Sequence, residues 1–303
     1  MRIGLVSAAI STPATTLDDL IAEARTSEDA GFDFLSLPNI FRFDAISALT
    51  LAGRETQRIE LMTGVVPTPP RHPFVMAQQA LTAQAACGGR FVLGIGLSHK
   101  VVIENVLGLS FSRPARQMRE YLEVLMPLAR GEAAQFEGEI YRVQANLDVT
   151  GAGTLPVVVA ALGPQMLALT GELADGTATW MTGERTLADH IVPTITKAAS
   201  AAGRPQPRVI ASLPIALASD PDAAKAAASK IFAMYGTLPS YRAMLDREGA
   251  AEPGDVAIAG DEATLRAALK RLADAGVTDF AASLFEAEDG TVERTRAFLL
   301  EQR

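Results

Sequence analysis

The chain has 303 residues, of which 49% are hydrophobic, enough for one large core. It carries 27 basic and 35 acidic residues, so its net charge is −8, and no basic block is interleaved with aromatic residues. We therefore expect no nucleic-acid partner, since nothing would neutralise a row of phosphates. The sequence contains no run of 18 apolar residues, so we expect no membrane span. We interpret the apolar residues at the start of the chain as the first strand of a cytoplasmic protein.

Short β-rich runs alternate with stretches of helical spacing in the first half of the chain. The predicted strands are residues 2–7, 32–37, 59–66 and 91–97. Residues typical of helix starts follow these strands, namely Thr16, Asp44, Pro73 and Pro114. Gly31 is typical of a residue that ends a helix.

The second half repeats this alternation. Its predicted strands are residues 157–161, 177–181, 209–217 and 278–284. Predicted helices begin at Leu162 and Asp220, and a further one covers residues 261–275 before the last strand. A helix near residues 184–202 should be kinked by Pro193.

Eight strands that alternate with helices imply parallel neighbours, because parallel strands need crossover helices. The predicted fold class is α/β, a closed (β/α)8 TIM barrel with insertions after strands 4 and 7, as one domain over residues 1–303. Residues 131–155 are interpreted as an inserted loop or hairpin, and residues 236–260 as a second irregular insertion. A doubly wound open sheet is the alternative, which the strand count alone does not exclude.

The active site of such a barrel is built from the loops at the carboxyl ends of the strands. One of these loops contains Gly163 and Pro164, where a strand passes into a helix. Pro164 suits the first helical position, and the free N–H groups of Gln165 and Met166 would suit a phosphate. A tight turn without any ligand explains the same spacing equally well.

The stretch from Gly94 to Gly96 ends the fourth strand. It is no dinucleotide fingerprint, because His99 occupies the place of the third glycine. Small residues here would let a flat ring lie close to the barrel mouth. The other histidines are His72, which a turn explains as well as a function does, and His190, which we expect to be structural or exposed. No two of the three share metal-ligand spacing, so no metal site is expected.

Trp180 is the sole tryptophan and lies at the predicted end of the sixth strand. Core packing explains it, and so does a role as a wall of a ligand pocket.

Several motifs in barrel order carry a family resemblance. Residues 64–73 (GVVPTPPRHP) with Gln78 and Gln79, and then residues 89–96 (GRFVLGIG), resemble the luciferase-like monooxygenase superfamily. Residues 160–166 (AALGPQM), 174–176 (ADG) and 180–183 (WMTG) are similar to its coenzyme F420-dependent branch. The resemblance covers nearly the whole chain.

The resemblance implies a TIM barrel, commonly dimeric, with a cofactor ring at the mouth against a strand-three bulge. The bulge contains a non-proline cis peptide, for which Gly64–Val65 is the preferred bond. The predicted cofactor-binding residues are Gly64, Val65, Val66, Gly96, Ser98, Ala161, Leu162, Gly163, Gln165, Met166, Trp180 and Met181.

One position departs from the family pattern. Enzymes of the branch often carry an acidic residue or histidine just after strand two, whereas this chain has Pro38 and Asn39. His99 is therefore the predicted catalytic proton donor or polarising group, with Asn39 able to donate a hydrogen bond. Glu104 is a weaker candidate.

The predicted function is hydride transfer between coenzyme F420 and a small organic substrate, by an oxidoreductase of the luciferase-like kind that forms a homodimer. The alternative cofactor is FMN, with which oxygen insertion becomes the natural reaction. A TIM-barrel lyase or isomerase acting on a phosphorylated metabolite is a second class, although no lysine lies in a predicted strand. A barrel that only binds a cofactor or partner is a third. The sequence does not identify the substrate.

Overall fold

The computed structural model describes residues 1–10 and 14–302. Within them, eight parallel strands close into a barrel: β1 (Arg2–Val6), β2 (Phe34–Leu37), β3 (Glu60–Thr63), β5 (Phe91–Gly96), β8 (Val157–Val159), β9 (Gly176–Trp180), β10 (Arg208–Leu217) and β12 (Asp279–Leu284). β10 pairs with β9 and β12, and β12 pairs with β1, which closes the ring. The predicted TIM barrel is confirmed, and the open-sheet alternative is wrong.

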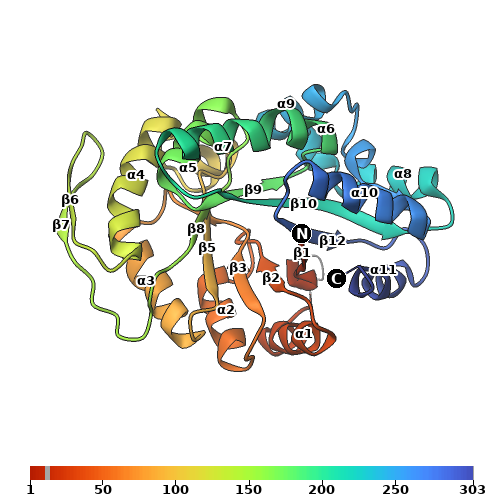
Figure 1. The fold of residues 1–303 in the computed structure, drawn as a ribbon, viewed down its shortest axis with the longest axis horizontal. Helices are drawn as coiled ribbons and strands as arrows, with labels where there is room; N and C mark the ends of the chain where they lie inside the picture. The colour runs from red at the N-terminus through yellow and green to blue at the C-terminus, as the bar shows by residue number, and fades with distance from the viewer. Residues whose placement is uncertain (11–13, 303) are drawn as a thin grey trace.

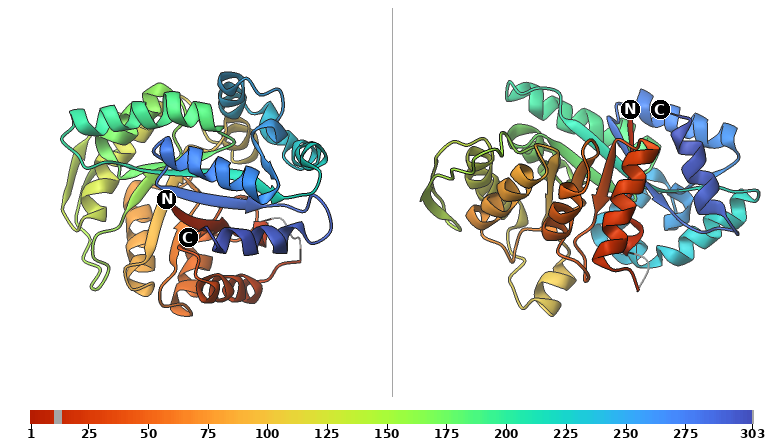
Figure 2. Two further views of the ribbon diagram at one scale, coloured as in Figure 1. Left: turned by 45° about the vertical axis from the view of Figure 1, so that its right-hand side comes forward. Right: turned by 90° about the horizontal axis from the view of Figure 1, so that it is seen from below.

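Helices follow the strands and form the outer layer (Figure 1). They are α1 (Leu17–Ala30), α2 (Ala45–Arg54), α3 (Pro73–Ala86), α4 (Pro114–Ala129), α5 (Pro164–Leu173), α7 (Val192–Ala201), α8 (Pro221–Ile231), α10 (Glu262–Asp274) and α11 (Thr291–Leu300). The two chain ends lie side by side near β1 and α11, as the views in Figures 1 and 2 agree. In the described residues, no helix is long and apolar enough to cross a membrane.

Local capping chemistry sets the helix bounds that the sequence predicts. Thr16 Oγ1 accepts a hydrogen bond from the Asp19 amide, and the Asp19 carboxylate accepts one from the Thr16 amide. Gly31 then ends α1 with φ 101°, a conformation that favours glycine. Asp44 caps α2 in the same manner as Thr16, through the Ser47 amide.

The region around Pro193 differs from the prediction. Instead of one kinked helix, a short α6 (Glu184–Thr186) passes into a π-helical turn, η3 (Leu187–Ile191), before α7 begins. The departure from α-helical geometry therefore precedes the proline. The sequence analysis also does not predict α11, which follows the last strand and packs on β10 and β12.

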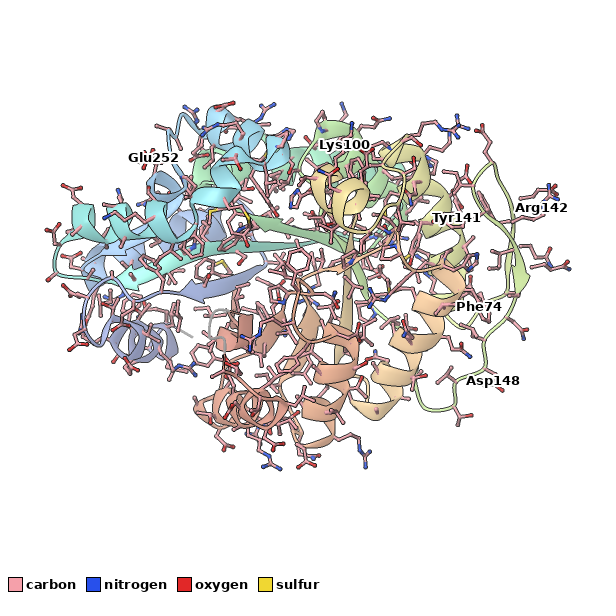
Figure 3. The ribbon with its side chains drawn as sticks, turned by 180° about the vertical axis from the view of Figure 1, so that it is seen from behind. Phe74, Lys100, Tyr141, Arg142, Asp148 and Glu252 are labelled. Carbon is pink, nitrogen blue, oxygen red and sulfur yellow. The ribbon has the colours of Figure 1, made fainter. Side chains whose placement is uncertain are left out.

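Both insertions are present. Residues 131–155 contain the antiparallel hairpin of β6 (Ala134–Glu137) and β7 (Arg142–Ala145), which projects from the barrel (Figure 1). Figure 3 shows Tyr141 at the inner side of this hairpin and Arg142 on its outer side. The second insertion begins with η4 (Ala233–Thr237), slightly before the predicted residue 236. It continues with α9 (Pro239–Glu248), η5 (Pro253–Val256) and a short strand, β11 (Ile258–Gly260), which pairs with β10.

The barrel interior is layered. At the amino-terminal end, Arg208 pairs with Glu60 at 2.9 Å and with Asp279 at 2.7 Å, and Arg2 contacts the same two carboxylates. Above these charges lies an apolar layer with one residue from each barrel strand: Val6, Phe34, Met62, Val92, Val158, Ala178, Ile210 and Ala281. In the described residues the barrel interior is therefore a packed core, and the carboxyl-terminal mouth is the end at which barrels of this kind bind ligands.

Candidate active site

Small side chains line the mouth of the barrel. Successive residues of a strand face opposite sides, so the residue two positions after each member of the apolar layer points the same way. For the seven members other than Val6, at which β1 ends, those positions are Ser36, Gly64, Gly94, Ala160, Trp180, Ser212 and Ser283. Six of the seven are Gly, Ala or Ser, so these positions place little side-chain volume above the core. Trp180 is the one large side chain of this set.

The third strand is interrupted at the mouth. β3 ends at Thr63, the Gly64–Val65 peptide bond is cis, and β4 (Val66–Pro67) resumes pairing with β5. The expected cis bond is thereby confirmed. Thr63 Oγ1 lies 2.8 Å from both the amide nitrogen and the carbonyl oxygen of Gly94, so this side chain replaces the missing ladder contacts.

Two glycines of β5 make room for the bulge. A Cβ on Gly94 would lie 2.0 Å from the Thr63 carbonyl oxygen, and one on Gly96 would lie 2.9 Å from a methyl group of Val65. The expectation that these small residues directly admit a cofactor ring is therefore incomplete, because Val65 fills the space. Gly64 and Val65 themselves are partly exposed, so the bulge can form the surface on which a ring rests.

Two strands end in residues with unusual backbone conformation. Ser98, after β5, has φ 62°, and Met181, after β9, has φ 53°. Non-glycine residues adopt this left-handed region rarely, at a cost of about 1–3 kcal/mol, and they gather at functional sites. The Met181 side chain is nevertheless fully buried in the outer core. The structure therefore does not bring the Met181 side chain to the mouth, although the sequence grouped it with the cofactor site.

The loop from β8 to α5 is built as an open helix start. A Cβ on Gly163 would meet no atom within 4 Å, and no side chain of the described residues caps α5. Gln165 is exposed and Met166 partly so. The first turn thus presents its free N–H groups outward, as an anion site requires.

Side chains from neighbouring strands and helices hold this loop. Thr177 Oγ1 donates to the Val159 carbonyl at 2.9 Å and lies 3.3 Å from the Ala161 amide. His190 Nε2 lies 2.8 Å from the carbonyl oxygen of Leu162. His190 is thus buried beside the candidate phosphate loop, a contact that its helical position in the sequence did not reveal.

His99 is half-buried at the mouth, and its ring centroid lies 5.3 Å from that of Tyr241. Burial lowers the pKa of His99 from its usual value of 6.5, so the imidazole is mainly uncharged at neutral pH. An uncharged imidazole can accept a proton through one nitrogen and donate a hydrogen bond through the other.

The other candidates for proton transfer are engaged elsewhere. Asn39 Oδ1 accepts a hydrogen bond from the Ala45 amide at 2.9 Å, so it fixes the start of α2. Glu104 lies on the π-helical turn η2 (Val102–Val106), 3.8 Å from Lys100. His72 caps α3 through the Phe74 amide, which supports the turn role weighed for it. In the right-hand view of Figure 2, the yellow excursion that carries η2 projects from the body.

Comparison with known proteins agrees with this geometry. The model of the luciferase-like monooxygenase family matches residues 2–298. A 5,10-methylenetetrahydromethanopterin reductase from Archaeoglobus fulgidus is 35% identical over 155 residues, which cover 50% of this chain and 46% of that protein. A putative coenzyme F420-dependent oxidoreductase from Mycobacterium tuberculosis is 34% identical over 176 residues, 52% of this chain and 49% of that protein. The matches span about half the length of these curated relatives.

A solved structure extends the likeness of fold to the whole chain. The coenzyme F420-dependent tetrahydromethanopterin reductase of Methanopyrus kandleri matches with a TM-score of 0.82 over 99% of this chain and 97% of that one, at 22% identity. That identity supports the barrel architecture alone, whereas the family model covers the sequence from the first strand to the last helix. The chain belongs to the luciferase-like monooxygenase family.

Proposed function

We propose that the protein is an oxidoreductase that binds coenzyme F420 and passes hydride between it and a small organic substrate. The observation that carries the proposal is the pairing, on one barrel, of a partly exposed bulge at Gly64–Val65 with an open helix start at Gly163. A flat ring with a phosphorylated side chain needs both surfaces. The relatives named for F420 or its reductases support the choice of cofactor.

The residues present fit this cofactor. The partly exposed Gly64 and Val65 would support the ring, whereas the Val66 side chain is fully buried in the core. Ser98 would contact the edge of the ring from the end of β5. The N–H groups that follow Gly163 would hold the phosphate, which the charge of a helix start favours. Bound F420 supplies two-electron hydride chemistry.

The proton accompanying the hydride is assigned to His99. When an alcohol is oxidised, its carbon loses a hydride and its hydroxyl loses a proton. The uncharged His99 imidazole would accept that proton, and in the reverse direction the protonated imidazole would return it. Asn39 can still donate from its amide nitrogen, since only Oδ1 is used by Ala45.

Fluorescence titration with oxidised F420, beside FMN, tests the cofactor. We expect F420 to bind at micromolar concentration and FMN more weakly. Tighter binding of FMN would move the proposal to flavin-dependent oxygenation, and failure of both to bind would remove the site.

We also propose that the protein forms a homodimer. The excursion after β5 exposes apolar side chains, among them Val106 at 60% and Leu107 at 44%, and Phe41 in the loop after β2 is 68% exposed. Such exposure is typical of protein contact surfaces. Light scattering after gel filtration measures the oligomeric state, and Val106→Asp is the variant expected to disrupt the dimer. A parent protein that stays monomeric at all concentrations would contradict the proposed dimer.

A further inference from the structure

Aromatic rings form a continuous chain over one side of the barrel mouth. We call it the ring wall; its members, in contact order, are His99, Tyr241, Tyr235, Trp180, Phe232 and Phe285. Adjacent ring centroids lie 5.3 to 6.2 Å apart, within the range of stabilising aromatic contacts. Because His99 follows β5, Trp180 ends β9 and Phe285 follows β12, the ring wall joins strand ends from separate parts of the barrel.

The middle of the ring wall comes from an irregular segment. Phe232 follows α8, Tyr235 lies in η4 and Tyr241 lies in α9, all between β10 and β11. In Figure 1 this segment lies beside α6 and above the end of β10. Loops in this position on a barrel contact the substrate, and their sequences set specificity.

The ring wall contains a polar atom that has no partner. Trp180 Nε1 is buried, and in the described part of the chain it makes no hydrogen bond. A buried N–H group without an acceptor is unfavourable, so this group needs an acceptor that the described residues do not supply, such as a bound water or a ligand oxygen. Trp180 belongs to the set of residues that face the mouth, where its ring stands edge-on to Phe232 and Tyr235.

The cations that follow the neighbouring strands are already paired. Arg71, in the loop after β4, pairs with Asp44 at the start of α2. Lys100, after β5, lies 3.8 Å from Glu104. Asp44 and Glu104 offset the charges of these two cations, so the charge distribution favours an uncharged substrate over a phosphate or a carboxylate.

We propose that the ring wall is the substrate-binding surface and that the substrate is a flat, mainly apolar ketone or alcohol whose oxygen accepts a hydrogen bond from Trp180 Nε1. This inference rests on the proposed function and names the substrate class of the same site. In this proposal Trp180 contacts the substrate and determines specificity, whereas the sequence analysis places it among the cofactor-binding residues.

The sole tryptophan makes the inference directly measurable. Nitrogen-15 labelling of the indole gives a single Nε1–H resonance, whose proton shifts when it donates a hydrogen bond. The probes are 1-indanone, a flat ketone, indane, which has the same skeleton without the oxygen, and glucose 6-phosphate as a polar anion. We expect 1-indanone to shift the resonance and to bind about fivefold to tenfold more tightly than indane. We expect glucose 6-phosphate to bind much more weakly and to leave the indole resonance unshifted.

Two variants separate the parts of the proposal. Trp180→Phe keeps a ring but lacks the N–H, and should bring the affinity for 1-indanone down to that for indane. Tyr235→Ala removes a neighbouring ring, and should weaken both ligands equally while leaving the affinity for F420 unchanged. Thermal unfolding of each variant shows whether it is folded.

Three outcomes would overturn the inference: binding of 1-indanone without movement of the indole signal, equal binding of glucose 6-phosphate, or a Trp180→Phe variant that loses F420 while it retains 1-indanone. The cofactor is followed separately by its own fluorescence. If 1-indanone shifts the indole signal and F420 does not bind, the proposed function fails and the ring wall stands as a ligand surface.

Discussion

His190 Nε2 lies 2.8 Å from the carbonyl oxygen of Leu162, so a buried histidine of the π-helical turn η3 holds the loop that leads to Gly163. Replacement by leucine removes that contact. Loss of a buried hydrogen bond costs about 1–3 kcal/mol, and we expect the freed loop to bind F420 several-fold more weakly. Affinity for the deazaflavin core without its phosphate should change little.

The exposed neighbour of His190 gives a matched control. Asp189→Asn alters the same turn without touching Leu162, and should bind F420 as the parent does. Fluorescence titration of both variants with F420 and with the phosphate-free core provides the measurement. Equal weakening for the two ligands would show that His190 supports the fold and not the phosphate loop.

Gly163→Ala tests the proposed phosphate site at the start of α5, because its methyl group would occupy that site. The added methyl group would meet no protein atom within 4 Å, and φ is −76°, which alanine adopts freely. Stability should therefore stay within about 0.5 kcal/mol of the parent. Affinity for F420 should fall about tenfold or more, since the methyl group would lie where the phosphate approaches its N–H donors. Unchanged affinity in a folded variant would remove Gly163 from the site.

Gly94→Ala, unlike Gly163→Ala, should lower the stability of the fold. Its Cβ would lie 2.0 Å from a backbone oxygen of Thr63, which no side-chain movement relieves. Overpacking of this kind costs about 1–3 kcal/mol, and we expect a loss near the upper end. Denaturant unfolding beside Gly163→Ala measures the contrast. Parent-like stability of Gly94→Ala would mean that the bulge can move away from β5.

The sequence predicts the barrel strands because they are apolar runs, some of them next to a glycine, such as β3 before Gly64 and β9 from Gly176. The family resemblance predicts the bulge at Gly64–Val65, but the sequence does not explain why Gly94 and Gly96 must be glycine. Their role depends on Val65, about thirty residues away in sequence, and local spacing carries no signal for such a contact. Thr63 bridging to Gly94 is hidden for the same reason.

The ring wall was equally inaccessible. Tyr241 lies in the predicted irregular insertion of residues 236–260, and Tyr235 directly precedes that insertion, where the sequence predicts no contact with the mouth. Their meeting with Trp180 and His99 depends on how that insertion folds back over the mouth. Of the two roles expected for His190, structural or exposed, the structure shows the structural one. Its contact with Leu162 depends on the π-helical turn, which helical spacing in the sequence does not predict.

Asp279→Asn separates stability from binding. The Asp279 carboxylate is 1% exposed and faces two arginines at the amino-terminal end of the barrel, 2.7 Å from Arg208 and 3.2 Å from Arg2. Removing one partner of a buried ion pair costs about 3–5 kcal/mol, because the remaining charges are left uncompensated. The affinity for F420 should not change in the folded fraction, since this end lies opposite the mouth. A large change in affinity without loss of stability would contradict the layered interior.

His99 should titrate below its usual range, and the sign of the effect follows from burial. Burial disfavours the charged imidazole and lowers its pKa below 6.5, so the unfolded chain binds this proton more readily than the native one. Stability therefore decreases as the pH falls through 6.5 toward the native pKa.

For alcohol oxidation, kcat/KM should be constant above the native pKa of His99 and decline below it, because the base becomes protonated. Proton NMR of the three imidazoles, with His99→Asn to assign one signal, measures the pKa directly. The same variant should lose about 10²–10⁴-fold in rate together with the acidic limb. A His99 pKa above 6.5, or a variant that retains the acidic limb, would assign the proton to another group.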